Sequence, residues 1–291
     1  MIYTGELPAK EPLPRRVTIE LTNRCSRNCP GCPRTMMHYP QGYMDFELLD
    51  KILGQLPSNT VIVPFYRGES LMHPRFSEAL WAIKQKGFDR VQLATNGDLL
   101  GIETSAVIYA ATAFTSISLH DYHLPKADQI TEFLTGARYH PLVTQVSIVE
   151  SMIPPSGAYT KKRFIAEWLQ YTDRVRIYVE HSHQGFGDVD PKHRDTAYRQ
   201  LGQRLPCPKP FDEMVVYWDG KVALCNHDWD NKAPLGDLNT QSVKAVWNSK
   251  PYEEVRELHT DRYGDMVASC KHCDYWMVPY LKKGMFGEVY T

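Results

Sequence analysis

The chain has 291 residues, of which 43% are hydrophobic, and its 33 Lys and Arg residues nearly balance 34 Asp and Glu residues. This length suits one large core or a main domain with a small appendage, since domains usually run to about 100 to 200 residues. The net charge of −1 gives no overall basic field for nucleic acid or an anionic membrane, and no apolar run approaches the roughly 18 residues that span a bilayer. We therefore expect a cytoplasmic globular protein that has no membrane partner and for which nucleic acid is disfavoured.

Six short runs rich in β-branched and apolar residues alternate with segments of helical periodicity. The expected strands lie at 17–21, 61–66, 91–95, 116–119, 143–149 and 175–179, and helices are expected, for example, at 46–56, 76–86 and 161–171. Strand and helix in alternation predict an α/β fold with a parallel sheet that helices cover. The spacing alone leaves open whether that sheet is doubly wound or closes toward a barrel.

Three cysteines follow the first expected strand, in the run CSRNCPGC that contains Cys25, Cys29 and Cys32. Three thiolates on one short loop can hold three irons of a 4Fe-4S cluster and leave the fourth iron without a protein ligand. Disulfides fit less well, because the seven cysteines are odd in number and no signal peptide precedes them. Zinc is a weaker alternative as well, since a closed structural site needs a fourth ligand.

The C-x3-C-x2-C spacing at the end of a first strand resembles that of the radical S-adenosylmethionine (SAM) enzymes. The resemblance implies a partial (β/α)6 barrel and an open iron that chelates SAM, which is cleaved to a 5'-deoxyadenosyl radical that removes a substrate hydrogen. An external electron donor such as flavodoxin or ferredoxin is implied too. Where family members usually have an aromatic residue just before the third cysteine, this sequence has Gly31.

The pattern changes after about residue 190. Prolines become frequent, the turn at 218–220 lies between apolar runs at 214–217 and 222–225, and a helix is expected at 243–259. The remaining cysteines are Cys207, Cys225, Cys270 and Cys273. Their chemistry alone suits a fully ligated 4Fe-4S cluster and a structural zinc site equally well.

The spacing of these four cysteines resembles the truncated SPASM module called Twitch. The resemblance implies a radical SAM barrel at residues 1–190 and, at 191–291, a small α+β module in which all four cysteines bind one auxiliary 4Fe-4S cluster. Cysteine count and spacing are also similar to those of the radical SAM alcohol dehydrogenases of aminoglycoside biosynthesis.

Further site residues follow the second and third expected strands. Gly68 and Glu69 match the family's Gly-Gly-Glu stretch, which binds the SAM amino group, whereas Arg67 replaces its first glycine. Thr95 and Asn96 close the third strand, where the family has a polar residue that contacts the SAM ribose. A surface-loop glutamate and an ordinary Asn-Gly turn are the alternatives.

Polar residues also follow the fourth and sixth expected strands. His120 lies in SISLHDYH, and Glu180, His181 and His183 lie in VEHSH. At a shared barrel mouth they would bind a polar substrate or take a proton from it, so His120, Glu180 and His181 are the candidate catalytic residues. Exposed loop residues without a catalytic role are the alternative for each.

The sequence favours an oxidoreductase that acts on a small molecule. The expected reaction is two-electron oxidation of a secondary alcohol on an amino sugar or aminocyclitol, with the auxiliary cluster as electron acceptor. Peptide modification and sugar epimerisation are the alternatives. A non-catalytic iron–sulfur scaffold is disfavoured, because an open three-cysteine loop is a poor structural support.

Overall fold

The computed structural model describes residues 11–29, 32–154, 160–178, 199–280 and 287–291, together with Leu7 and Thr196. Its strands are β1 (Arg16–Ile19), β2 (Val61–Val63), β3 (Gln92–Thr95), β4 (Phe114–Ser118), β5 (Val143–Val149), β6 (Arg174–Tyr178), β7 (Glu213–Val216), β8 (Lys221–Ala223), β9 (Gly236–Asp237) and β10 (Glu288–Tyr290). Its α-helices are α1 (Phe46–Leu53), α2 (Phe76–Gln85), α3 (Ile102–Ala111), α4 (Gln129–Ala137), α5 (Lys161–Trp168), α7 (Lys209–Asp212), α8 (Val243–Trp247) and α9 (Lys250–Thr260). Short 3₁₀ turns are η1 (Pro33–Met36), η2 (Ser70–Met72), η3 (Glu150–Met152), η4 (Gly264–Met266) and η5 (Tyr275–Tyr280).

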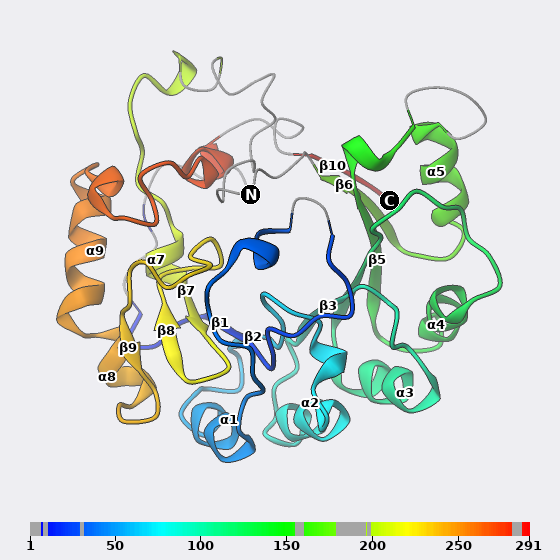
Figure 1. Ribbon diagram of the computed structural model, residues 1–291, viewed down its shortest axis with the longest axis horizontal. Helices are drawn as coiled ribbons and strands as arrows, with labels where there is room; N and C mark the ends of the chain where they lie inside the picture. The colour runs from blue at the N-terminus through cyan, green and yellow to red at the C-terminus, as the bar shows by residue number, and fades with distance from the viewer. Residues whose placement is uncertain are drawn as a thin grey trace.

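The strands form one curved surface that helices cover from outside (Figure 1). Two five-stranded sheets have the orders β2-β1-β7-β8-β9 and β10-β6-β5-β4-β3. Strands β3 to β6 run parallel to one another, and a parallel bridge between Ile62 and Val91 joins the two sheets. The expected α/β fold with a partial (β/α)6 barrel is therefore confirmed.

The two faces of the strands differ in polarity. Ile117 of β4 belongs to the apolar core, together with Phe133 of α4 and Phe164 of α5. Ser116 of β4 and Ser147 of β5 alternate with such core residues along their strands, so they lie on the opposite, concave face. The barrel therefore has an apolar outer face, which its helices cover, and a polar inner face.

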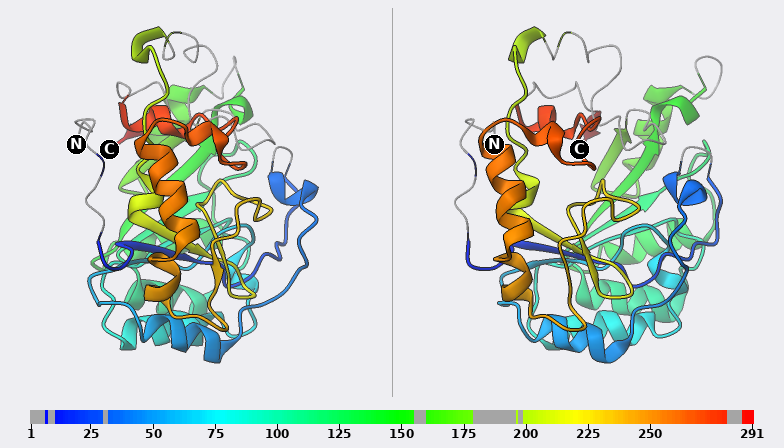
Figure 2. Two further views of the ribbon diagram at one scale, coloured as in Figure 1. Left: turned by 90° about the vertical axis from the view of Figure 1, so that its left-hand side faces the viewer. Right: turned by 60° about the vertical axis from the view of Figure 1, so that its left-hand side comes forward.

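The C-terminal part of the chain continues the same sheet. Strand β7 pairs in parallel with β1, with Val17 opposite Met214, and β8 returns antiparallel to β7. The hairpin expected from the Asp-Gly turn is present, and Gly220 has the positive φ of 85° that favours glycine. Figure 2 shows the orange helix α9 beside this extended sheet, with the red segment that follows it at its end.

The helix expected at 243–259 is in fact two helices, so that prediction was wrong. Helix α8 ends at Trp247, and α9 begins at Lys250 with Ser249 as its N-terminal flanking residue. Pro251 lies in the first turn of α9. Proline lacks an N–H group and clashes with the preceding turn of a helix. It is therefore favoured in the first turn of a helix, and it breaks a helix in whose interior it would lie.

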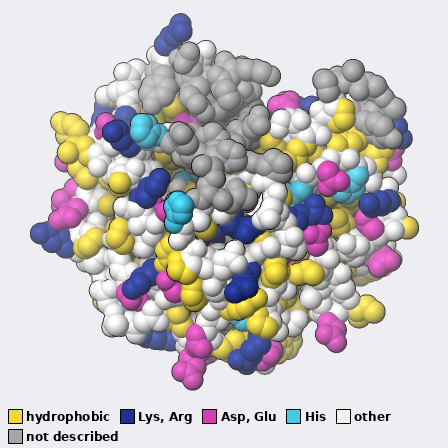
Figure 3. Space-filling model, viewed as in Figure 1, with side chains coloured by type: hydrophobic (Ala, Val, Ile, Leu, Met, Phe, Trp, Pro, Cys, Tyr) yellow, Lys and Arg dark blue, Asp and Glu magenta, His cyan; other side chains and the backbone are white. Residues whose placement is uncertain are grey.

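The chain end returns to the barrel, where β10 pairs antiparallel with β6. Within the ranges described above, no helix is long and apolar enough to cross a membrane. On the face seen in Figure 3, acidic and basic side chains are interspersed wherever the surface is described.

Candidate functional site

The first three cysteines lie on the loop that follows β1. They are partly exposed and not joined by disulfides, and the N–H of Cys32 donates to the carbonyl of Cys29 at 3.1 Å. Burial raises the pKa of Cys29, and the negative charges that Cys32 and Cys25 would carry as thiolates raise it further. Three thiolates that repel one another suit a cationic iron centre, which relieves that repulsion. Gly31, before the third cysteine, lies outside the described residues.

Gly68 packs directly on the backbone that leads to Cys25. A β-carbon at Gly68 would lie 2.4 Å from the carbonyl oxygen of Thr22 and 2.5 Å from that of Arg24. The N–H of Glu69 donates to the same Arg24 carbonyl at 2.8 Å. The loop after β2 therefore holds the start of the cysteine loop by close backbone contact, which only glycine permits.

The Glu69 carboxylate is 3% exposed and joins the ends of β2 and β3. Its Oε2 accepts from the N–H of Asn96 at 2.7 Å, and its Oε1 accepts from the N–H of Leu71 at 3.2 Å. Burial raises the pKa of Glu69, although these bonds and one with the Thr95 side chain lower it. A buried carboxylate that retains acceptor capacity suits an ammonium partner.

Asn96 connects this network to the cysteine loop. Its Nδ2 donates to Ser26 Oγ at 3.0 Å and lies 3.9 Å from Cys25 Sγ. Its Oδ1 accepts from the N–H of Asp98 at 2.9 Å, which fixes the turn after β3. The four residues expected at the SAM site thus lie together beside the first cysteine.

Arg27 of the cysteine loop is bound to the same turn. Its Nε and Nη2 donate to the two carboxylate oxygens of Asp98 at 2.7 and 2.5 Å. The Arg27 guanidinium lowers the pKa of Asp98. This pair could not be predicted from the sequence, because nothing in either motif signals a contact across 71 positions.

His120 lies close to the cysteine loop, where its Nδ1 is 3.0 Å from Cys29 Sγ. Burial lowers its pKa, and the nearby Arg27 lowers it further. His120 continues the alternation of Ser116 and Ser118, which places it on the concave face. Its catalytic role stays a prediction, while Glu180, His181 and His183 lie outside the described residues.

A row of polar side chains follows this concave face across three strands. We call it the polar row, and its members are Ser116, Ser118, Gln145, Ser147 and Arg176. Ser118, Ser147 and Arg176 are in register on neighbouring parallel strands. Ser147 Oγ lies 3.3 Å from the hydroxyl oxygens of both Ser116 and Ser118.

Arg176 is the cation of the polar row. Its guanidinium lies 4.3 Å from the centre of the Tyr178 ring. Its Nε is buried and has no hydrogen-bond partner within the described ranges. An unsatisfied buried donor is costly, so this nitrogen suits an acceptor group of a bound molecule.

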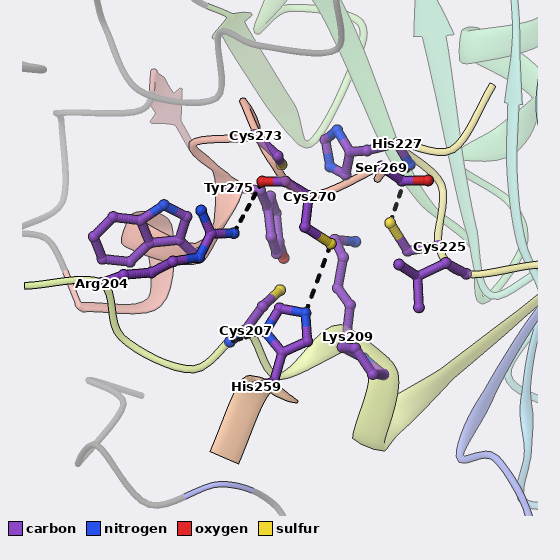
Figure 4. A pocket seen from close by; sticks show the side chains of 13 residues that line it. Arg204, Cys207, Lys209, Cys225, His227, His259, Ser269, Cys270, Cys273 and Tyr275 are labelled. Atoms are coloured by element: carbon purple, nitrogen blue, oxygen red, sulfur yellow. Dashed lines mark hydrogen bonds between the residues drawn. The ribbon is translucent and has the colours of Figure 1, made fainter. Parts of the chain in front are cut away.

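The other four cysteines line one pocket (Figure 4), to which they come from three segments. Cys207 precedes α7, Cys225 follows β8, and Cys270 and Cys273 follow η4. The first three of these are buried, and none of the four is in a disulfide. Among the described residues no three His, Cys, Asp or Glu side chains are grouped so as to hold a single metal ion.

Polar side chains surround this pocket. The Lys209 ammonium is buried, where it binds Glu213 at 3.1 Å and Asn226 at 2.6 Å and lies 4.1 Å from the Tyr275 ring centre. His259 lies 3.6 Å from Cys270 Sγ, and burial lowers its pKa to about 4. Four thiols beside a lysine and a histidine fit an iron–sulfur cluster, because cysteine thiolates ligate its irons and neighbouring N–H groups can donate to its sulfurs.

The loop after β2 also contacts the segment that begins at Cys225. Tyr66 Oη donates to the carbonyl of Asp228 at 3.0 Å, and Arg67 Nη1 donates to that of Trp229 at 2.7 Å. Burial raises the pKa of Tyr66, and among the further causes is the nearby Cys225. One loop therefore contacts both the segment that leads to Cys25 and the segment that follows Cys225.

A partial barrel with three cysteines after its first strand, and four more around a second pocket, defines an iron–sulfur enzyme that binds a cofactor at its first site. Family models agree: the radical SAM superfamily matches residues 19–122, and the iron-sulfur cluster-binding SPASM domain matches 207–274. The chain belongs to the radical SAM superfamily and carries a SPASM domain. Its cofactors are accordingly SAM, a 4Fe-4S cluster and auxiliary iron–sulfur.

Three curated relatives span most of the chain. The SAM-dependent 2-deoxy-scyllo-inosamine dehydrogenase of Niallia circulans is 22% identical over 89% of this chain and 92% of its own. The tungsten-containing aldehyde ferredoxin oxidoreductase cofactor-modifying protein of Pyrococcus furiosus is 34% identical over 88% of this chain and 86% of its own. The antilisterial bacteriocin subtilosin biosynthesis protein AlbA of Bacillus subtilis is 31% identical over 93% of this chain and 68% of its own.

The fold is also that of a solved radical SAM enzyme. A crystal structure of BtrN in complex with AdoMet and 2-DOIA has a TM-score of 0.63 and 18% identity, and the match covers 90% of this chain and 93% of that one. The fold of this chain therefore recurs in that solved structure.

Proposed function

We propose that this enzyme oxidises a secondary alcohol of an amino sugar or aminocyclitol by two electrons. The observation that carries the proposal is the loop after β2, which contacts the segments next to both cysteine sites through Gly68 on one side and Arg67 on the other. When bound, SAM with its cluster supplies a radical that removes a hydrogen atom, and the auxiliary cluster supplies an acceptor for the second electron.

The first site uses the residues gathered after β1, β2 and β3. Cys25, Cys29 and Cys32 hold the SAM-binding cluster. The Glu69 carboxylate, whose oxygens already accept two backbone N–H groups, orients the amino group of SAM. Asn96, beside Cys25, contacts the ribose, while Gly68 and Thr95 keep the two loops in place.

The polar row is the proposed substrate wall. Hydroxyl groups both donate and accept hydrogen bonds, so neighbouring serine hydroxyls suit the alternating hydroxyl groups of a polyol ring. Arg176 offers its unpaired Nε to a substrate oxygen. His120 lies on the same face, and Nε2 is the nitrogen left for a substrate proton because Nδ1 faces Cys29. Glu180 and His181 remain candidates for the same proton transfer.

The second cysteine site accepts the second electron that the substrate loses. Cys207, Cys225, Cys270 and Cys273 hold the auxiliary cluster, and full thiolate ligation suits an outer-sphere acceptor, which needs no open iron. An external donor such as flavodoxin or ferredoxin would supply the first electron to the SAM-binding cluster.

Peptide modification is the second candidate. The specific observation in its favour is that a protein named for bacteriocin biosynthesis is 31% identical to this chain, whereas the named dehydrogenase is 22% identical. An extended peptide could also use the hydroxyl groups and the guanidinium of the polar row, through its backbone carbonyls.

The two candidates are separated by one experiment on anaerobically reconstituted enzyme. We expect about eight irons per chain, and 5'-deoxyadenosine formed together with ketone when aminocyclitols and amino sugars are supplied. If no sugar or aminocyclitol yields ketone and supplied peptides change in mass instead, peptide modification is favoured. About four irons plus zinc would remove the internal acceptor and refute the proposed oxidation.

A further inference from the structure

We propose that His259 donates a hydrogen bond to the sulfur of Cys270 and thereby raises the reduction potential of the auxiliary cluster. The inference rests on the proposed function, in which Cys270 binds that cluster and the cluster accepts an electron from the substrate. His259 is then a positioning residue, since it acts on the cluster through a ligand and touches no reacting atom.

The position of the imidazole proton follows from one backbone contact. The N–H of Cys207 donates to Nδ1 of His259 at 3.3 Å. A backbone N–H can only donate, so Nδ1 accepts and carries no hydrogen. The ring hydrogen is therefore on Nε2, which faces Cys270 Sγ at 3.6 Å. One ring thus joins two of the four cysteines, as an acceptor for the first and a donor for the second.

The surroundings hold this ring in place. His259 is in the last turn of α9 and is 1% exposed. A β-carbon at Gly264 would lie 2.7 Å from both Cε1 and Nδ1 of the ring, so the glycine provides the space that the imidazole fills. Arg204 Nη2 donates to the carbonyl of Cys270 at 3.0 Å, which fixes the other partner. Figure 4 shows the contact between the ring and the sulfur.

A donor at this sulfur favours the reduced cluster. Reduction adds negative charge that is shared by the ligating sulfurs, and a hydrogen bond to a sulfur stabilises that charge. The buried Lys209 has its charge compensated by Glu213 at 3.1 Å, so it contributes less to such a shift. His259 has no acidic partner among the contacts found for it and acts on the sulfur directly.

Two variants each remove one of the two hydrogen bonds of the His259 ring and keep the other. In His259→Asn the short amide reaches the position of Nδ1, so an acceptor for Cys207 remains and the donor to Cys270 is lost. In His259→Gln the longer amide reaches the position of Nε2, so the donor remains and the acceptor is lost. Each variant loses one hydrogen bond, and a merely structural role for the ring would make their effects alike.

The measurement is a potentiometric titration of the reconstituted full chain, followed by electron paramagnetic resonance. The SAM-binding cluster of the same chain is the internal reference. We expect His259→Asn to lower the auxiliary potential by about 59 mV, which is a tenfold change in the equilibrium constant for one electron. We expect His259→Gln to stay close to the unmodified enzyme. Equal shifts in both variants, or none in either, would overturn the proposal.

A measurement on the unmodified enzyme covers the case in which the variants fail to fold. Electron-nuclear double resonance on the reduced auxiliary cluster, in water and in heavy water, should detect an exchangeable proton at the Cys270 sulfur, and its absence would refute the hydrogen bond. Ketone formation is assayed on the same samples. If the unmodified enzyme and both variants have the same auxiliary-cluster potential and still form ketone, this inference alone is overturned. If the second site contains zinc, the proposed function is overturned together with this inference.

Discussion

Arg67 and Glu20 form a fully buried ion pair, in which Nε and Nη2 of the arginine each donate to a different carboxylate oxygen at 2.6 Å. The guanidinium carbon lies 3.6 Å from the centre of the Tyr217 ring, and Nη1 donates to the carbonyl of Trp229. The residue that stands where the family has a glycine therefore connects β1 with the hairpin and with the segment after Cys225.

Removing Arg67 should destabilise the protein strongly. Arg67→Met leaves the Glu20 carboxylate buried without its cation, and breaking a buried pair in this way costs about 3–5 kcal/mol. Unfolding in denaturant, followed by circular dichroism on the metal-free chain, measures this loss. Because Arg67 directly precedes Gly68 and Glu69, which contact the start of the cysteine loop, we also expect weaker SAM binding in the reconstituted variant.

The control is a double variant that removes both charges. Glu20→Gln with Arg67→Met should recover part of the lost stability, since no unpaired charge remains. A single variant as stable as the unmodified chain would contradict the role given to the pair. So would a double variant less stable than Arg67→Met alone.

Gly68→Ala should prevent assembly of the SAM-binding cluster. The added carbon would meet two backbone carbonyls, which cannot move without displacing the start of the cysteine loop. We expect loss of about four irons per chain and of SAM cleavage, measured by iron analysis and 5'-deoxyadenosine formation. Gly101→Ala is the matched control, because a β-carbon at Gly101 has nothing within 4 Å. Normal cluster content in the Gly68 variant would refute the close-packing argument.

Much of the barrel was predictable from local pattern. Helix α1 begins after Asp45, whose side chain accepts from the N–H of Glu47 at 2.8 Å, and a positive-φ Gly87 lies just past the end of α2. Such signals are encoded within a few residues, as is the Asp-Gly turn of the hairpin. The cysteine spacings identified the two groups of thiols for the same reason.

The long-range contacts were not predictable in this way. The pairing of β7 with β1 joins residues about two hundred positions apart, and the sequence records only that both strands are apolar. His259 was assigned only to the end of a helix, because its contacts with Cys207 and Cys270 depend on tertiary packing. Arg67 was noted only as a departure from the family motif, since its partner Glu20 carries no local signal.

Removal of the auxiliary ligands should separate SAM cleavage from substrate oxidation. Cys207→Ala with Cys225→Ala takes away two of four ligands, so we expect the iron content to fall from about eight to about four per chain. SAM cleavage should continue, because the first three cysteines are untouched, while ketone formation stops. Cys29→Ala is the opposite control and should abolish SAM cleavage. Undiminished ketone formation in the double variant would contradict an acceptor role for the second site.

Arg176→Gln should weaken substrate binding and leave the cofactor chemistry intact. A charge-assisted hydrogen bond contributes about 1.5–3 kcal/mol, so its loss should raise the KM for the alcohol by about tenfold to a hundredfold. SAM cleavage without substrate should not change, because the proposed partner of Arg176 is the substrate and not SAM. Arg174→Gln is the matched control: it is two residues earlier on the same face of β6, but exposed. Since the proposed substrate contact belongs to the buried Nε of Arg176 alone, an equal rise of KM in both variants would point to general electrostatic attraction and refute a specific contact with Arg176.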